Sequence, residues 1–228
     1  MSPPTLVDTR DYVLVTGANG FAGRSVCRLL LKRGWRVLAA VRGPIQADAL
    51  RNAIDTQAGL EIAQVRDIGP DTHWEMLLDG CKAVVHLAAR VHMMRDHAAD
   101  PLAEFRRVNR DGTIKLAGAA VAAGVRRFLF ASTVKVNGED SGVGSFKESD
   151  PPKPADPYAI SKFEAEQALL AFAQAGQLDV TILRAPLMYG PHVKGNFLSL
   201  LRLVDKGLPL PLGAVANRRS LLYVENFS

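Results

Sequence analysis

One pair of residues in this chain has the types and the spacing that acid–base chemistry needs. Tyr158 and Lys162 stand four positions apart in Tyr-Ala-Ile-Ser-Lys, so a helix would place both side chains on one face. A free phenol titrates near pH ~10, and a nearby ammonium lowers the phenol's pKa because it favours the phenolate. Tyr158 could then donate or accept a proton at neutral pH. The same spacing is common on solvent-exposed helices, so the surroundings must decide between the two interpretations.

A glycine-rich turn near the start of the chain has the spacing of a phosphate-binding loop. An apolar run at 12–15 leads into Thr-Gly-Ala-Asn-Gly-Phe-Ala-Gly at 16–23, and helical spacing of apolar residues follows. Strand, glycine turn and helix form the context that such a loop requires. Gly17 would permit the tight turn, Gly20 the close approach of a pyrophosphate, and Gly23 the packing of helix on strand. Free N–H groups at the start of the helix would face the anion.

The rest of the chain alternates apolar runs with helical spacing, which predicts an α/β fold with a doubly wound, Rossmann-type parallel sheet. The expected strands cover 12–15, 35–41, 60–65, 83–87, 127–131 and 180–183, and the expected helices cover 24–32, 47–55, 71–78, 101–123, 159–174 and 197–206. We therefore expect a dinucleotide-binding domain over 1–185. Residues 186–228 contain a loop at 208–213 and a short strand at 221–224, and we interpret them as a small C-terminal substrate-binding lobe that is incomplete.

The composition fits one globular core and argues against several other classes of protein. The chain has 228 residues, of which 48% are hydrophobic. No apolar run approaches the roughly 20 residues that span a bilayer, so we expect no membrane insertion. Cys27 and Cys81 give neither a disulfide framework nor a metal-binding spacing, which favours a cytoplasmic location. The net charge of +5 is spread over scattered lysines and arginines, so we expect an anionic small molecule rather than a nucleic acid as the partner.

The glycine turn resembles that of a known family. Its spacing is Gly-x-x-Gly-x-x-Gly, preceded by Thr16 and carrying Phe21. This resembles the extended short-chain dehydrogenases/reductases, the NAD(P)-dependent nucleotide-sugar epimerases, dehydratases and reductases. The family has its catalytic tyrosine–lysine pair after the fifth strand, where Tyr158 and Lys162 stand. The resemblance covers nearly the whole chain and implies that Tyr158 is the proton donor or acceptor. It also implies that Lys162 lowers the pKa of Tyr158 and bonds the nicotinamide ribose.

The resemblance implies two further catalytic residues at the end of the fifth strand. The family places a serine or threonine there, five residues before a glycine, and Thr133 stands five residues before Gly138. The Thr133 hydroxyl would bond the reacting sugar oxygen beside Tyr158, with Ser132 in support. On the residues alone, Ser132 and Thr133 could instead cap backbone groups at the strand end.

A cofactor-binding set also follows from the resemblance, at the carboxyl ends of the strands, where open parallel sheets hold ligands. Asp67 and Ile68 match an adenine-contacting pair, and Asn109 matches a helix position that organises an active-site water. Each residue taken alone could have a packing or capping role. Ala185 departs from the family's proline. With Arg42 added, the full cofactor-binding set is Gly17, Asn19, Gly20, Phe21, Ala22, Gly23, Arg42, Asp67, Ile68, Leu87, Ala88, Ala89, Asn109, Lys162, Ala185 and Pro186.

Arg42 bears on the choice between the two nicotinamide cofactors. An NAD-selective loop carries Asp or Glu at the end of the second strand, where it bonds the ribose 2′-hydroxyl. This chain has Ala-Val-Arg at 40–42. Arg42 could pair with a 2′-phosphate, although it could also stack on adenine. We therefore favour NADP(H), with NAD(H) as the other choice.

Four residues are expected to contact a nucleotide-diphosphate sugar, namely Arg90, Thr133, Asn196 and Arg219. Asn196 and Arg219 match nucleotide-sugar contacts of the family, and a guanidinium can bond two diphosphate oxygens at once. His92 and Met93, close to Arg90 after the fourth strand, are expected near the substrate as well. The histidines of this region lack further ligands, so we expect no metal.

The residues after Thr133 bear on the reaction. The family's 4,6-dehydratases need an Asp-Glu pair there to eliminate water, and this chain has Val134-Lys135. The local sequence resembles a bacterial branch that includes 4-ketoreductases, so we favour a reductase of a UDP-(acetamido)-deoxyhexose in surface polysaccharide synthesis. A UDP-hexose 4-epimerase is the alternative, and a redox-silent dinucleotide-binding regulator is the second alternative. The helices at 101–123 and 158–174 could form a homodimer, as in the family, or simply pack on the sheet.

Overall fold

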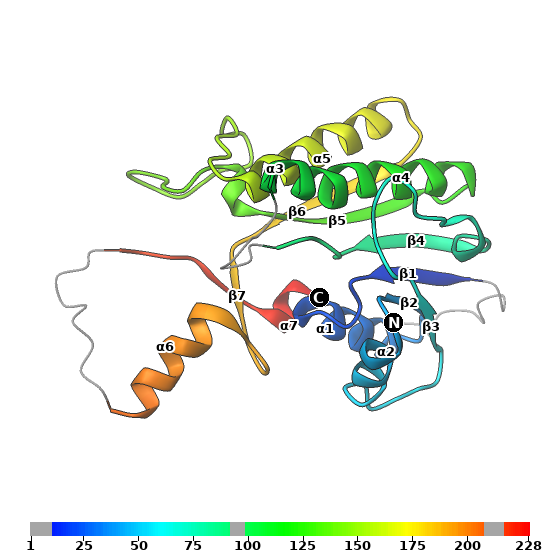
Figure 1. The fold of residues 1–228 in the computed structure, drawn as a ribbon, viewed down its shortest axis with the longest axis horizontal. Coiled ribbons are helices and arrows are strands. Elements are labelled where there is room, and N and C mark those ends of the chain that lie inside the picture. The colour runs from blue at the N-terminus through cyan, green and yellow to red at the C-terminus, as the bar shows by residue number, and fades with distance from the viewer. Residues whose placement is uncertain (1–10, 92–98, 208–216) are drawn as a thin grey trace, which may run out of the picture.

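Six parallel strands form the central sheet, in the order β3-β2-β1-β4-β5-β6 (Figure 1). The computed structural model describes residues 11–91, 99–207 and 217–228. The strands are β1 (Tyr12–Thr16), β2 (Arg36–Val41), β3 (Leu60–Gln64), β4 (Cys81–His86), β5 (Arg127–Thr133) and β6 (Asp179–Ala185). The order reverses between β1 and β4, which is the arrangement of a doubly wound dinucleotide-binding sheet. The predicted Rossmann-type α/β fold is confirmed.

Helices cover both faces of the sheet, as parallel strands require. They are α1 (Phe21–Lys32) and α2 (Pro44–Arg51) on one face, and α3 (Pro101–Phe105), α4 (Gly112–Ala122) and α5 (Pro157–Gln174) on the other (Figure 1). Successive side chains of β1 enter different cores, because Val13 and Val15 pack with α1 and α2 whereas Leu14 packs with α4 and α5. A one-residue slip would exchange the two sets, so the cores fix the register of the strand.

The helical stretch predicted over 101–123 is present but is not one regular α-helix. A π-helical turn, η2 (Arg106–Asp111), separates α3 from α4. Asn109 lies in this turn, and its side chain is 1% exposed. Such turns often occur at functional sites, and a hydrophobic pattern does not distinguish them from a continuous helix.

The predicted helix over 71–78 is wrong. Only a single 3₁₀ turn, η1 (Glu75–Leu77), forms there. The Thr72 hydroxyl accepts a hydrogen bond from the Gly69 N–H (2.9 Å) and donates one to the Asp67 carbonyl (3.1 Å). These bonds hold a loop in competition with a helix. Trp74 then enters the core and is fully buried.

β5 and β6 both extend two residues beyond their expected ends. They pair with each other along their whole length, up to Thr133 opposite Ala185. This pairing makes Ser132 and Thr133 part of the sheet rather than of a loop. The side chains at this end of β5 therefore start from a well-fixed backbone.

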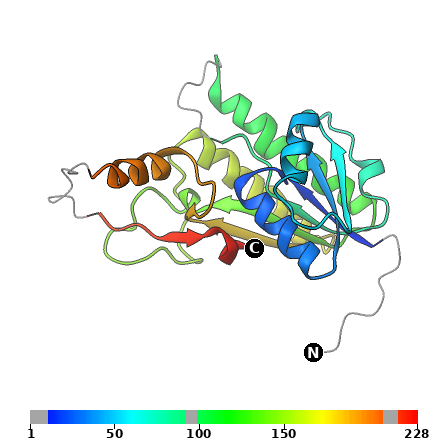
Figure 2. The same cartoon turned by 90° about the horizontal axis from the view of Figure 1, so that it is seen from below.

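A second, two-stranded sheet follows β6. β7 (Leu187–Tyr189) pairs in parallel with β8 (Leu221–Tyr223). α6 (Gly195–Asp205) lies between them in the sequence, and Figure 2 shows it beyond the edge of the main sheet. β7 was not predicted, because a three-residue strand leaves too short an apolar pattern.

The last helix returns to the main sheet. The strand expected over 221–224 ends at Tyr223, because the next residue, Val224, begins α7 (Val224–Phe227). This helix packs on α1. The Ser228 hydroxyl donates to the Ser25 hydroxyl at 2.7 Å. In the described part of the chain, no helix is both long and apolar enough to cross a membrane. The division into domains at 185/186 stays a prediction, and the loop expected at 208–213 lies outside the described residues.

Gly23 offers a test of the packing between α1 and the glycine turn. A Cβ added there would lie 2.2 Å from the Gly17 carbonyl oxygen and 2.7 Å from the Ala18 carbonyl oxygen. We expect Gly23→Ala to lower the free energy of unfolding by about 2 kcal/mol or more, because backbone must move. Gly118→Ala in α4 is the matched control, since its new Cβ meets nothing within 4 Å. It should raise the stability by up to about 1 kcal/mol. Chemical denaturation measures both, and equal stabilities would contradict this packing.

Candidate active site

The carboxyl ends of the six strands meet along one edge, because all strands run in the same direction. Most predicted site residues stand on that edge. They are Gly17 after β1, Arg42 after β2, Asp67 after β3, Leu87, Ala88 and Ala89 after β4, Ser132 and Thr133 at the end of β5, and Ala185 and Pro186 at and after the end of β6. The expected juxtaposition of these residues at one sheet edge therefore follows directly from the topology.

The glycine turn forms a cradle of backbone at the start of α1. Gly17 has φ +67°, and a Cβ there would lie 2.7 Å from the Ala88 nitrogen of the neighbouring loop. The Gly20 N–H donates to the Gly17 carbonyl at 2.8 Å, and Gly20 caps α1 without a side-chain hydrogen bond. The first N–H groups of α1 thus lie beside a turn in which Gly17 and Gly20 carry no side chain, which suits a phosphate group.

Arg24 supports this cradle, although the sequence analysis assigned it no role. Its guanidinium donates to the Asn19 carbonyl (3.0 Å) and to Asn19 Oδ1 (2.7 Å). Phe21 and Ala22, the first two residues of α1, lie between Asn19 and Arg24 in the sequence. The arginine therefore holds the tip of the turn in one conformation, with Asn19 as its partner.

A chain of buried hydrogen bonds runs from the glycine turn through His86. Thr16 Oγ1 accepts from the Ala88 N–H (3.2 Å) and lies 2.6 Å from His86 Nδ1. His86 Nε2 lies 3.0 Å from Thr113 Oγ1, which donates to the Asn109 carbonyl at 2.6 Å. Because the Thr113 proton is already used, His86 must donate from Nε2 and accept at Nδ1. Burial, with the nearby Lys162, lowers the pKa of His86 to about 3, so it is neutral and every proton in the chain has an acceptor.

Asn109 ties the loop after β4 to α5. Its Oδ1 accepts from the Arg90 N–H (2.8 Å), and its Nδ2 donates to the Arg90 carbonyl (3.0 Å) and to the Ser161 hydroxyl (3.0 Å). Ser161 in turn donates to the Tyr158 carbonyl at 2.8 Å. These contacts account for the burial of Asn109, and its predicted part in cofactor binding stays a prediction.

Tyr158 is the second residue of α5. Asp156 caps the helix by accepting from the Ala159 N–H at 2.7 Å. The Phe105 ring packs edge-on against the Tyr158 ring, with 6.1 Å between centroids. Burial first, and then the charge of Asp156, raises the pKa of Tyr158 to about 12. At rest the phenol therefore holds its proton.

Lys162 is almost completely buried, four residues further along α5. Its Nζ lies 3.8 Å from the centroid of the Phe130 ring, and its residue is 1% exposed. Burial lowers the pKa of Lys162 to about 7, and the Glu166 carboxylate opposes this shift. The two side chains, four residues apart on α5, contact different elements: the Tyr158 ring lies against Phe105 of α3, and the Lys162 ammonium lies over Phe130 of β5.

A buried carboxylate connects the ends of β5 and β6. Glu166 on α5 is 1% exposed and accepts from the Ser132 hydroxyl and from Arg184, whose Nη2 lies 2.6 Å away. Arg184 also donates to Asn137 Oδ1 at 3.2 Å. The hydroxyl of Ser132, expected to support catalysis, is therefore engaged with Glu166. One feature of the sequence could have indicated a role for Glu166: it stands four residues after Lys162, on the same face of the helix.

Thr133 is the last residue of β5, and Asp67 stands three residues after the end of β3. Their contacts with the substrate and with adenine stay predictions. Thr133 is 9% exposed, and its Oγ1 accepts from the Lys135 N–H at 3.3 Å. Asp67 is exposed and pairs with Arg107 at 2.6 Å. The hydrogen bond from Arg107 lowers the pKa of Asp67, and Arg42 adds to this effect. Arg107 was missed, because the pair joins positions that are far apart in sequence.

The predicted substrate contacts are more scattered. Arg219 is exposed ahead of β8, and Asn196 lies in the first turn of α6. Arg90 lies over the Phe105 ring, 5.5 Å from its centroid. His92 and Met93 lie outside the described residues. Among the described residues, no three His, Cys, Asp or Glu side chains are grouped so that they could hold a metal.

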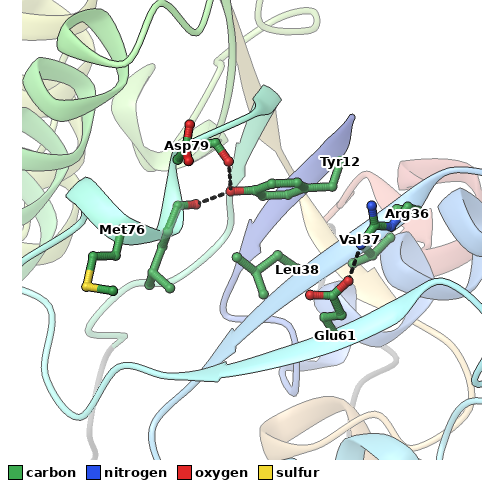
Figure 3. Close-up of a pocket in the computed structure, with 8 residues that line it drawn as sticks. Tyr12, Arg36, Val37, Leu38, Glu61, Met76 and Asp79 are labelled. Carbon is green, nitrogen blue, oxygen red and sulfur yellow. Dashed lines mark hydrogen bonds and ion pairs between the residues drawn. The ribbon is translucent and has the colours of Figure 1, made fainter. Parts of the chain in front are cut away.

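A cavity of about 290 Å³ lies away from these groups, between the amino-terminal ends of β1, β2 and β3 (Figure 3). There the Tyr12 hydroxyl donates to the Leu77 carbonyl at 2.8 Å, and Arg36 pairs with Glu61. Figure 3 shows these side chains bridging the strand ends and the loop before β4. Ligands of open parallel sheets bind at the opposite edge, so we assign this cavity a structural role.

The sheet order, the glycine cradle and the groups at the carboxyl edge define a Rossmann-type dinucleotide-binding protein. A profile of the NAD dependent epimerase/dehydratase family matches residues 13–227. The chain therefore belongs to that family, and the family suggested by the sequence is confirmed.

Several known proteins are similar to this chain. UDP-glucose 4-epimerase of Vibrio cholerae is 44% identical over 217 residues, which cover 94% of this chain and 63% of that protein. The structure of DesIV, a dTDP-glucose 4,6-dehydratase of Streptomyces venezuelae with NAD bound, has a TM-score of 0.75 and 33% identity over 94% of this chain and 68% of that one. The structure of UDP-glucuronic acid 4-epimerase of Bacillus cereus, in complex with UDP-glucuronic acid and NAD, has a TM-score of 0.78 and 25% identity. The match covers 94% of this chain and 69% of that one. The chain thus spans less than two thirds of the length of the Vibrio cholerae relative.

Thr113 offers a test of the hydrogen-bond chain through His86. Thr113→Val keeps the shape of the side chain but leaves the buried Nε2–H of His86 without its acceptor. We expect the free energy of unfolding to fall by about 1–3 kcal/mol, measured by chemical denaturation. Thr113→Ser keeps the hydroxyl and should restore most of the loss. A valine variant as stable as the wild type would contradict this chain of buried hydrogen bonds.

Proposed function

We propose that this protein is an NAD(P)-dependent oxidoreductase that acts at C4 of a nucleotide-diphosphate sugar. The observation that carries the proposal is the position of Thr133, Tyr158 and Lys162 at the same sheet edge as the glycine cradle. Nucleotide-sugar epimerases and dehydratases among the similar proteins support it.

A nicotinamide dinucleotide fits the cradle. Gly17 and Gly20 leave the backbone N–H groups open to a pyrophosphate, and α1 has no side-chain cap in the way. The small residues Ala88 and Ala89 would let the ribose and phosphate pass close to the loop after β4. When bound, the cofactor supplies hydride transfer to and from the sugar carbon. Lys162 would hold the nicotinamide ribose.

The chain's own residues would handle the proton. The Thr133 hydroxyl would orient the sugar oxygen by a hydrogen bond. Tyr158 would give its proton to a C4 ketone oxygen, or remove the proton of a C4 hydroxyl in the opposite direction. Its raised pKa suits the resting phenol to the role of donor. To act as a base, it needs a nearby positive charge.

Two forms of this reaction are open, and each has support. The 44% identity to UDP-glucose 4-epimerase of Vibrio cholerae favours a 4-epimerase. The sequence Val-Lys-Val-Asn-Gly after Thr133 resembles the branch with 4-ketoreductases and favours a reductase. In place of a dehydratase's carboxylates, Lys135 is paired with Asp156 at 2.6 Å, so elimination of water is not proposed.

Turnover of nucleotide sugars separates the two forms. The protein is incubated with UDP-hexoses and with their 4-keto derivatives, and NMR follows the sugar while absorbance follows the reduced nicotinamide. An epimerase interconverts C4 epimers without net consumption of cofactor, whereas a reductase consumes one NAD(P)H for each sugar. Tyr158→Phe should lower kcat about 10²–10⁴-fold, the usual contribution of a general acid or base. If Tyr158→Phe left the biological function of the protein unchanged, both forms would be excluded and the redox-silent regulator would be favoured.

The cofactor preference has a separate test at Arg42. Its side chain is exposed after β2 and close enough to Asp67 to influence that carboxylate. We propose that Arg42 pairs with the 2′-phosphate of NADP(H), although the similar structures hold NAD. Arg42→Ala should then weaken NADPH binding about 10-fold, since a hydrogen bond to a charged group contributes about 1.5–3 kcal/mol. NADH binding should stay the same, as isothermal titration would record. An equal loss of affinity for NADPH and NADH would contradict the proposed preference for NADP(H).

We also propose that the protein forms a homodimer through the helices at 101–123 and 158–174. The outer faces of α4 and α5 carry Ile114 and Leu170, which are 38% and 41% exposed. A hollow of about 400 Å³ between the helices is lined by apolar residues such as Ala119 and Phe172. A second copy could cover this surface.

A further inference from the structure

Lys135 stands at the edge of the proposed catalytic centre, next to the segment that carries Thr133, and has no role in the proposed reaction of Thr133, Tyr158 and Lys162. It lies in η3 (Val134–Val136), two residues after Thr133, and its N–H donates to Thr133 Oγ1. Its ammonium reaches across to α5 and lies 2.6 Å from Asp156 Oδ2. Glu139 lies on its other side at 3.1 Å. The ammonium thus links the segment that carries Thr133 to the helix that carries Tyr158.

The two oxygens of Asp156 each contact a group that matters for Tyr158. Oδ1 accepts from the Ala159 N–H at 2.7 Å and caps α5, while Oδ2 takes the ammonium of Lys135. A carboxylate at a helix N-terminus is favourable for the helix. Its negative charge is unfavourable for Tyr158, which is only two residues away, because it opposes formation of the phenolate.

The two charges act on Tyr158 in opposite senses. Asp156 raises the pKa of the phenol and Lys135 lowers it, in addition to the effect of burial. Lys135 is charged throughout the neutral range, because the hydrogen bond to Asp156 raises the pKa of its ammonium. The side chain is 43% exposed, so its charge is screened in part but not removed.

Among the described residues, the other groups around the Tyr158 ring do not supply the cation that acts on the phenol. From α3, the ring is packed by the apolar Phe105, with the Arg90 guanidinium 5.5 Å from the Phe105 centroid. On α5, the Lys162 ammonium lies over the Phe130 ring, and its pKa of about 7 leaves it only partly charged at neutral pH. Of the described charges that act on the phenol, Lys135 is the cation.

We propose that Lys135 is a positioning residue that tunes proton transfer at Tyr158 by cancelling the negative charge of Asp156. The helix cap can then remain charged without making the phenol too weak an acid for its task. This inference rests on the proposed role of Tyr158 as proton donor and acceptor. Lys135 acts through Tyr158 and needs no contact with the sugar.

A charge cycle tests this inference without any substrate. Lys135→Met removes the charge and keeps most of the side-chain stem, and Asp156→Asn removes the opposing charge while keeping a good helix cap. Fluorotyrosine replaces tyrosine throughout the protein, because ring fluorination makes the phenol more acidic and brings its titration towards the range in which the protein is folded. Fluorine NMR follows the titration, and loss of one signal in Tyr158→Phe assigns it.

The expected shifts have opposite signs. Lys135→Met should raise the pKa of Tyr158 by about one pH unit, and Asp156→Asn should lower it by a similar amount. The double variant should return close to the wild-type value, and Lys135→Arg should match the wild type. Glu139→Gln is the control, because it removes the other partner of Lys135 and should shift Tyr158 much less.

Either of two titration results would overturn the inference: an unchanged pKa of Tyr158 in Lys135→Met, or a double variant whose pKa stays as far from the wild-type value as that of Lys135→Met alone. With an active substrate, the pH dependence of kcat should move with the titration. A lower kcat with an unmoved pH dependence would mean a merely structural role and would also overturn it. Should the titration shift as expected while no nucleotide sugar is turned over, the role of Lys135 stands and the proposed function fails.

Discussion

The turn after β1 passes directly against the backbone of the loop after β4, and this close approach determines how the site is built. A side chain at Gly17 would collide with the Ala88 backbone, so the contact requires a glycine. The hydrogen bond from the Ala88 N–H to Thr16 then fixes the two loops together. Because β1 and β4 meet where the strand order reverses, the contact lies at the position where such sheets hold a dinucleotide.

Buried polar groups extend this contact to α5. The chain from Thr16 through His86 to Thr113 is neutral, and each donor in it has one acceptor. Asn109 continues the connection to Ser161 on α5. In a medium of low dielectric constant, a single missing partner in such a network is costly. The cradle and the first turns of α5 therefore have little freedom to move independently.

The sequence predicted the features that local spacing encodes. The alternation of apolar runs with helical spacing gave five of the expected helices and all six main strands within a few residues, and the glycine spacing indicated the family. Features that depend on distant partners were missed. The side chain of Asn109 is held by Arg90 and Ser161, and no periodicity in the chain reports such contacts. The same holds for Arg107, which pairs with a residue on another element.

Lys162 shows why burial here points to chemistry rather than to packing. Its folded pKa of about 7 lies below its ordinary value of 10.5. The unfolded chain therefore binds more protons than the folded one between these values, and the contribution of Lys162 to stability rises with pH over that window. At neutral pH, the buried lysine thus costs stability, and Glu166 only reduces that cost. An apolar residue over the Phe130 ring would avoid the cost altogether. A protein that keeps a lysine there, beside Tyr158 and the glycine cradle, gains something other than stability from it.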